Sequence, residues 1–133
     1  DIRRAQWIKF AMLAPFSGVT TLTGHSAAAL RATPGTYALL RSAVQEVIDV
    51  ARAEGVMIKP DDFESVMKTI DQLPDAMTSS MAHDRRTGKP LEVEWLSGGV
   101  VRAGARHGLP TPTHAFIAQA LSVDAAGSAR DGA

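Results

Sequence analysis

The chain has 133 residues, no cysteine, and 14 lysines and arginines against 14 aspartates and glutamates. Its length is typical of one domain with a buried core, and the lack of cysteine excludes disulfides, thiolate metal sites and a cysteine nucleophile. Because the net charge is zero, there is no basic excess that would favour nucleic acid or an acidic membrane surface as a partner.

The N-terminal stretch superficially resembles a secretion signal, because Arg3-Arg4 precedes an apolar run over residues 7–14. Lys9 interrupts that run, however, and Pro15 and Gly18 break it soon after. We therefore predict a helix that ends before Pro15. No run in the sequence approaches the ~20 apolar residues of a membrane span, and we expect a cytoplasmic protein that does not bind membranes.

The next stretch, Gly24-His25-Ser26-Ala27-Ala28, nearly matches the G-x-S-x-G nucleophile elbow of hydrolases, with Ala28 in place of the last glycine. An elbow also needs a parallel sheet around it, and the sequence downstream favours no strands. We therefore interpret this stretch as a joint between helices, with Ser26 as a capping residue.

Two amphipathic helices are predicted in the middle of the chain. The first begins at Thr33-Pro34-Gly35 and ends at Gly55, and the second begins at Asp61 or Asp62 and ends at Leu73-Pro74. Apolar residues recur in both at spacings of three and four, which is typical of a helix with one buried face. These residues are Tyr37, Leu40, Val44, Val47, Ile48 and Ala51 in the first helix, and Phe63, Val66, Met67 and Ile70 in the second.

After Pro74 we predict a polar helix, a tight break and a second helix within residues 78–101. Gly88 suits the left-handed conformation that ends a helix, and Pro90 suits the first turn of the next one. Glu92 would then lie in that first turn, where the helix dipole favours a negative charge. A hydroxyl-rich helix and a carboxylate would thus meet at one corner, which is a plausible floor for a small polar ligand.

The second of these helices contains Gly98, Gly99 and Gly104, and glycines at that density indicate that another segment packs closely against it. A last helix is predicted over residues 113–122, and the tail 123–133 has too little apolar surface to order itself. Six or seven helices with no credible strand pair predict an all-α, compact multi-helix domain over residues 1–122.

Three groups of residues stand in a fixed order along the chain: Trp7-x-Lys9-Phe10, then Ser79-Ser80-Met81…Asp84…Arg86-x-Gly88-Lys89-Pro90-x-Glu92, then Arg106-His107-Gly108-Leu109-Pro110-Thr111-Pro112. Together they resemble the C-terminal domain of ketopantoate reductase (2-dehydropantoate 2-reductase), and the likeness runs from about Trp7 to Leu121. The resemblance implies a helical fold of the 6-phosphogluconate dehydrogenase C-terminal-like type.

By this resemblance the chain is half of an oxidoreductase. Members of the family reduce ketopantoate to pantoate, a step of pantothenate biosynthesis, with NADPH bound mainly by an N-terminal Rossmann domain. This sequence has no G-x-G-x-x-G after a strand, so we expect that domain to be an absent partner and this chain alone to be inactive. A homodimer stays open. The alternative interpretation is a non-catalytic helical dimerisation or ligand-binding module derived from the same domain.

The resemblance assigns the catalytic role to Lys9. Its ammonium group would stabilise the charge that develops on the carbonyl oxygen of a small 2-oxo acid, and would deliver the proton. We expect partial burial of this lysine beside Trp7 and Phe10. Without the resemblance, Lys9 would be interpreted as a lysine that extends from a helix edge to solvent.

The resemblance also assigns substrate-binding residues. Glu92 would accept a hydrogen bond from the substrate's hydroxyl, Ser80 would bind its carboxylate, and Ser17 would line the site. The chain departs from the best-known members, which have asparagine at the positions of Leu13 and Ser17, and usually at that of Ser97. These changes leave a different or bulkier 2-oxo acid open as the substrate.

Other candidate sites are weaker in the sequence. His107 and His114 are seven residues apart, but glycine and proline between them break any shared helix, so no metal site is predicted. Arg85-Arg86 with Lys89 would suit either an NADP phosphate, the missing domain, or solvent.

Overall fold

The computed structural model describes residues 1–127, and within them every regular element is a helix. This confirms the all-α prediction. The helices are α1 (Ile2–Thr23), α2 (Ala27–Ala32), α3 (Pro34–Ala53), α4 (Asp62–Asp71), α5 (Ser80–Arg86), α6 (Ser97–Arg106) and α7 (Pro112–Leu121), followed by the short 3-10 helix η1 (Ser122–Asp124).

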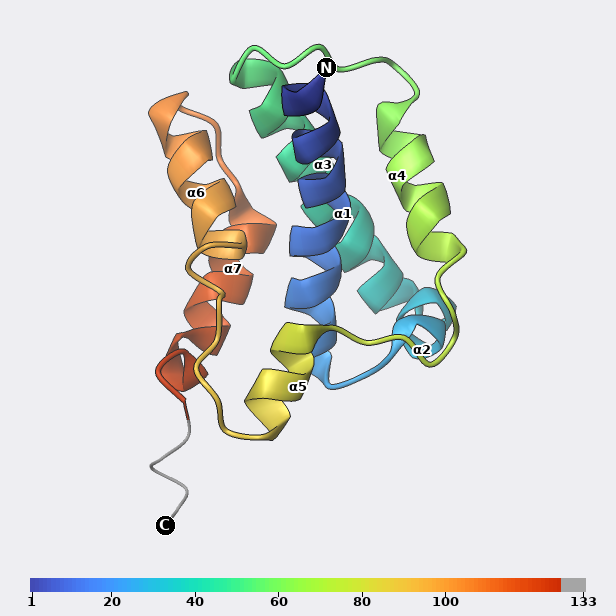
Figure 1. Ribbon diagram of the computed structural model, residues 1–133, viewed down its shortest axis with the longest axis vertical. Helices are drawn as coiled ribbons and strands as arrows, with labels where there is room; N and C mark the ends of the chain where they lie inside the picture. Colours follow the sequence, from blue (N-terminus) through green and yellow to red (C-terminus); the bar gives the residue numbers. More distant parts are fainter. Residues whose placement is uncertain (128–133) are drawn as a thin grey trace.

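Helix α1 contacts α3, α4, α5, α6 and α7, while α2 packs on α3 and α4 (Figure 1). In that view α4 lies on one side of α1, α6 and α7 lie on the other, and α5 lies by its C-terminal end. The apolar spacing explains most of the core, since eight of the ten residues predicted to face inward in α3 and α4 are buried, and the other two, Tyr37 and Phe63, are half-buried and pack against the core. Those buried are Leu40, Val44, Val47, Ile48 and Ala51 of α3, and Val66, Met67 and Ile70 of α4.

The first helix is longer than predicted. It continues through Pro15 and Gly18 to Thr23, so the expected break at Pro15 is wrong. Proline has a backbone φ suited to a helix and removes only one hydrogen bond, and burial of this part of α1 by its neighbouring helices outweighs that loss. Gly18 serves close packing, because a Cβ there would lie 3.0 Å from Cδ1 of Ile117 on α7.

The segment between α4 and α5 is not helical, although the sequence favours a helix directly after Pro74. Its carbonyl groups instead accept hydrogen bonds from the start of α2, from Ala27 N to Met77 O at 2.9 Å and from Ala28 N to Asp75 O at 3.0 Å. Ser26 occupies the predicted cap position of α2 but makes no side-chain capping bond, because these two carbonyl groups satisfy the amides.

The corner at Gly88 forms as predicted, but the helix after it begins later. Gly88 has φ 78°, and the Lys89 amide donates to the Asp84 carbonyl at 2.8 Å to close the end of α5. Glu92 lies in a turn before α6 and not in its first helical turn, so that prediction is wrong. Leu91 and Val93 on either side of it are buried, while Glu92 itself is exposed.

Residues 123–127, expected in a disordered tail, are ordered against the domain. Arg85 Nε donates to Asp124 Oδ2 at 2.9 Å, and the Leu91 amide donates to the Ala125 carbonyl at 2.9 Å. The domain therefore extends past the boundary predicted at residue 122, and the rest of the predicted tail, 128–133, lies outside the described residues. Within residues 1–127 no helix is long and apolar enough to cross a membrane.

The glycines of α6 confirm the predicted close packing at two of three positions. A Cβ on Gly104 would lie 2.9 Å from the Leu109 carbonyl oxygen, and one on Gly98 would lie 3.3 Å from the Val93 carbonyl oxygen. Gly99 is different, since its nearest neighbour would be Phe10 Cζ at an ordinary 3.9 Å.

Candidate functional site

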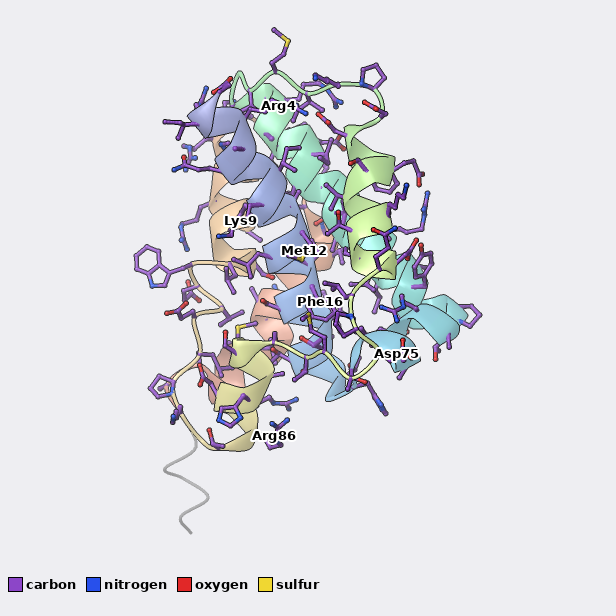
Figure 2. All side chains as sticks on the ribbon, turned by 45° about the vertical axis from the view of Figure 1, so that its right-hand side comes forward. Arg4, Lys9, Met12, Phe16, Asp75 and Arg86 are labelled. Atoms are coloured by element: carbon purple, nitrogen blue, oxygen red, sulfur yellow. The ribbon has the colours of Figure 1, made fainter. Side chains whose placement is uncertain are left out.

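One face of α1 is left uncovered in the upper two-thirds of the helix. Figure 2 shows Lys9 on this side of α1, with α4 to the right and α5, which carries Arg86, toward the lower end. Helical periodicity places the exposed residues on one stripe, and we call this stripe the open face of α1. Its residues are Ile2, Ala5, Gln6, Lys9 and Leu13, all of them exposed.

Lys9 is exposed, so the partial burial expected beside Trp7 and Phe10 is wrong. Those two rings contact each other at 90° and line a separate groove between α1 and α6. Lys9 lines a hollow of about 230 Å³ between α1 and α4 instead, together with Ile8, Met12, Ser65, Val66 and Thr69. Within residues 1–127 its ammonium group has no hydrogen-bond or ion-pair partner, which leaves it free to bind a ligand.

Ser17 lies on α1 two turns beyond Lys9, at a distance of about 12 Å along the helix axis. Ser17 is only 3% exposed, which makes it the least accessible of the four predicted site residues. Leu13 lies between the two and is 40% exposed. The open face of α1 therefore presents the apolar side chain of Leu13 at a position where the best-known members of the resembling family have asparagine.

Ser80 is the first residue of α5 and is exposed. α5 packs on the C-terminal half of α1, which brings Ser80 to the same end of the helix as Ser17. The connection is made by Ser79, whose hydroxyl lies 2.7 Å from that of Thr20 on α1. Sequence reasoning missed Thr20 and Ser79; the signal available was the position of Ser79 directly before the helix, where serine is a common cap.

Glu92 is exposed in the turn between α5 and α6, and its carboxylate makes no hydrogen bond or ion pair within residues 1–127. Its carbonyl group, by contrast, accepts from the amides of Trp95 and Leu96 at 3.0 and 3.1 Å, which fixes the backbone of the turn. The carboxylate is thus free on an ordered backbone. The convergence of Glu92 with Lys9 stays a prediction.

Arg85 and Arg86 have separate surroundings. Arg85 donates from Nη1 to the Thr21 carbonyl at 2.9 Å and from Nε to Asp124, so it joins α5 to α1 and η1. Arg86 is exposed, and its Nη2 lies 3.3 Å from Nδ1 of His83. The structure therefore gives Arg85 a structural role and leaves Arg86 on the surface.

A buried serine–histidine pair, Ser97 and His114, resembles a nucleophile with its base, with 3.0 Å between Oγ and Nδ1. Both residues are 0% exposed, and the second ring nitrogen of His114 bonds the Ala43 carbonyl at 2.9 Å. A substrate cannot reach them, so the pair serves packing. Residues 1–127 also contain no group of three or more His, Asp or Glu side chains arranged to hold a metal ion.

The chain matches a known family over almost its whole length. The family described as "Ketopantoate reductase PanE/ApbA C terminal" matches residues 1–124. A 2-dehydropantoate 2-reductase of Mycobacterium tuberculosis is 36% identical over 112 residues, which cover 84% of this chain and 37% of the relative.

Solved structures give the same result. A dimeric ketopantoate reductase from Staphylococcus aureus superposes with a TM-score of 0.86 at 28% identity, covering 93% of this chain and 43% of that one. A PanE/ApbA family ketopantoate reductase from Ralstonia eutropha JMP134 gives a TM-score of 0.84 at 27% identity, covering 93% of this chain and 41% of that one. The chain therefore spans about two fifths of the length of the relatives it matches.

Proposed function

This chain belongs to the ketopantoate reductase family, and from that premise we propose that it is the substrate-binding C-terminal domain of an NADPH-dependent reductase of 2-oxo acids. The observation that carries the proposal is the family match over residues 1–124, joined to an uncovered face of α1 that bears Lys9. The relatives are more than twice as long, and the proposed remainder is an N-terminal Rossmann domain that binds NADPH.

The proposed role of Lys9 follows from its chemistry. NADPH would supply the hydride, and as the hydride reaches the carbonyl carbon of the substrate, negative charge develops on the carbonyl oxygen. A lysine ammonium within hydrogen-bond reach stabilises that charge and donates a proton to the oxygen. The absence of any partner for the Lys9 ammonium within residues 1–127 supports this role, because no internal ion pair has to break first.

Ser80, Glu92 and Ser17 are proposed to hold the substrate. Ser80 would donate its hydroxyl proton to the substrate carboxylate, and Glu92 would accept a hydrogen bond from a substrate hydroxyl. Both side chains are exposed and unpartnered within residues 1–127, which supports a role toward a ligand. Ser17 would contribute at the lower end of the open face of α1.

The experiment uses the full-length protein with NADPH and ketopantoate, and follows loss of NADPH absorbance. The wild type is expected to reduce ketopantoate or a related 2-oxo acid. Lys9→Ala is expected to lower kcat by about 10²- to 10⁴-fold with a much smaller change in KM, since its bond strengthens only in the transition state. An unchanged kcat would remove Lys9 from the chemistry.

A control locates the cofactor site. The isolated 133-residue chain is expected neither to bind NADPH tightly nor to turn over substrate. Titration of the isolated chain with NADPH checks this, and binding at micromolar concentration would contradict the proposed division of labour between the two domains.

A further inference from the structure

Thr20 is a buried residue of α1 whose hydroxyl makes two short hydrogen bonds. It lies 2.7 Å from the Phe16 carbonyl oxygen, to which it mainly donates, 3.2 Å from the Ser17 carbonyl oxygen, which shares the same proton, and 2.7 Å from Oγ of Ser79. A hydroxyl group has one proton to donate, and the Phe16 carbonyl can only accept it. In the bond between the two hydroxyls, therefore, Ser79 is the donor and Thr20 the acceptor.

Ser79 in turn caps α5. Its Oγ accepts a hydrogen bond from the Ala82 amide at 3.1 Å, and its carbonyl accepts from the His83 amide at 3.1 Å. A continuous series of bonds thus runs from the Ala82 amide through Ser79 and Thr20 to the Phe16 carbonyl. The donor and acceptor of every bond in the series are determined, so the first turn of α5 is attached to α1 in one arrangement.

α5 needs such attachment because it has only seven residues and a helix of that length does not persist alone. Met81 and Ala82 bury its apolar side, and Arg85 bonds the Thr21 carbonyl from its last turn. The end of α5 that carries Ser80 is held by the Thr20–Ser79 bond, one residue away from the Ser80 backbone.

We propose that Thr20 is a positioning residue that acts through Ser79 to place Ser80 against the carboxylate of the 2-oxo acid. This inference rests on the function proposed above, in which Ser80 binds that carboxylate. Thr20 is 0% exposed and does not touch the substrate itself. Its effect is on binding, since the carboxylate is held alike in the ground state and the transition state, and such contacts govern KM more than kcat.

The test variant is Thr20→Val in the full-length enzyme, which keeps the shape of the side chain and removes the hydroxyl. We expect KM for the 2-oxo acid to rise by about five- to tenfold while kcat stays within about twofold. Thr20→Ser, which keeps the hydroxyl, is expected to restore most of the wild-type KM. A variant that only misfolds would instead lower the fraction of active enzyme and leave KM unchanged.

The matched control is Thr23→Val. Thr23 lies on the same helix and bonds a carbonyl four residues back, Val19 O at 2.8 Å, as Thr20 does with Phe16. None of the hydrogen bonds in residues 1–127 joins Thr23 to α5. We therefore expect Thr23→Val to leave KM within about twofold of the wild type.

A double-mutant cycle shows whether Thr20 acts through Ser80. In a Ser80→Ala background, Thr20→Val is expected to cause no further rise in KM. An equal rise in both backgrounds, or no rise in either, would overturn the proposal. If Thr20→Val does not fold, Ser79→Ala replaces it in the same cycle with the same outcomes. A wild-type enzyme that reduces no 2-oxo acid would instead overturn the proposed function, and this is visible before any variant is made.

Discussion

Ser97 on α6 and His114 on α7 form a hydrogen bond in the interior of the domain, with 3.0 Å between Oγ and Nδ1 and neither residue exposed. Nε2 of the same ring lies 2.9 Å from the Ala43 carbonyl oxygen of α3. A carbonyl group only accepts, so Nε2 carries a proton; burial lowers the pKa of His114 and favours the neutral ring, in which Nδ1 accepts from the serine hydroxyl. One neutral imidazole thus joins three helices.

Ser97→Ala is expected to lower the free energy of unfolding by about 1–3 kcal/mol, because it leaves a buried ring nitrogen without a partner. Urea unfolding of the chain measures the change. Ser42→Ala, at an exposed position on α3, is the control and is expected to stay within about 0.5 kcal/mol of the wild type. An equal loss of stability in both variants would contradict a specific role for the Ser97 bond.

The stability of the domain is expected to fall in mild acid because His114 is buried. Burial lowers the pKa of His114 below its usual value of 6.5, because the charged form loses its hydration. Well above pH 6.5 the His114 ring is neutral in both the folded and the unfolded state, so it does not reduce the free energy of unfolding. Below that pH the unfolded state takes up a proton first, so stability falls as the pH falls.

Urea unfolding between about pH 8 and pH 5 tests this, with a slope below the usual histidine pKa of at most about 1.4 kcal/mol per pH unit. His114→Gln keeps an amide of similar reach and has no titratable group, so its curve is expected to be flatter over this range. Parallel curves for the two proteins would show that another group is responsible.

The periodic helices could be predicted from the sequence, whereas features fixed by distant contacts could not. The buried residues of α3 and α4 follow from spacing alone, because each helix has one apolar side. The predicted helix end at Pro15 was wrong, because the rule that proline ends a helix considers only the local sequence and not the packing that keeps α1 helical on both sides of Pro15. The segment before α6 is also joined to a distant part of the chain, because the Leu91 amide donates to the Ala125 carbonyl, more than thirty residues further along.

In the candidate site, too, features set by the local sequence could be predicted and features set by distant contacts could not. The corner at Gly88 follows from a local signal, since a glycine commonly ends a helix. The Thr20–Ser79 bond joins residues that are 59 positions apart, and no spacing rule connects them. The exposure of Lys9 depended on which side of α1 the helices α4 and α6 would cover.

Asp62 is expected to stabilise the domain through a nearly buried ion pair between α1 and α4. Arg4 donates from both terminal nitrogens to its carboxylate, at 2.6 and 2.7 Å, and the Lys59 amide donates to it at 2.7 Å. The Arg4 hydrogen bonds lower the pKa of Asp62 from 3.8 to about 2. This stability is present above pH 3.8 and disappears as the pH falls toward about 2.

Asp62→Asn is therefore expected to cost about 1–2 kcal/mol at neutral pH and progressively less in acid below the usual aspartate pKa. Chemical unfolding at about pH 7, 4 and 3 gives the comparison. The neighbouring Asp61→Asn is a matched control, because Asp61 is exposed and makes no capping bond. A destabilisation at Asp62 that does not shrink in acid would exclude the ion pair as its source.

Two glycines of α6 are expected to respond to alanine in opposite directions. Gly104→Ala would bring a Cβ to within 2.9 Å of the Leu109 carbonyl oxygen, and because that backbone cannot easily move, the domain is expected to lose stability by about 1–3 kcal/mol. Gly99→Ala meets only ordinary contacts and is expected to gain about 0.5–1 kcal/mol from helix propensity. Thermal unfolding of the pair provides the measurement, and a gain at Gly104 would refute the close packing.

Leu13→Asn is expected to change substrate preference in the full-length enzyme. Leu13 stands on the open face of α1 one turn from Lys9 and is 40% exposed, so a substrate bound there would meet an apolar surface. Asparagine would add a hydrogen-bond donor and acceptor at this point. The value of kcat/KM is therefore expected to rise for a hydroxyl-bearing 2-oxo acid such as ketopantoate, and to fall for one with a purely apolar side chain.

The ratio of the two kcat/KM values is the decisive quantity, since a general fall in activity would lower both alike. We expect the ratio to move by about tenfold, because the asparagine amide can hydrogen-bond the substrate hydroxyl and no longer offers leucine's apolar surface to the other substrate. Ala5→Ser adds a polar group to the same face, one turn of α1 on the other side of Lys9, and is expected to leave the ratio unchanged. If both variants move the ratio equally, the preference reflects the polarity of the whole face and not the side chain at position 13.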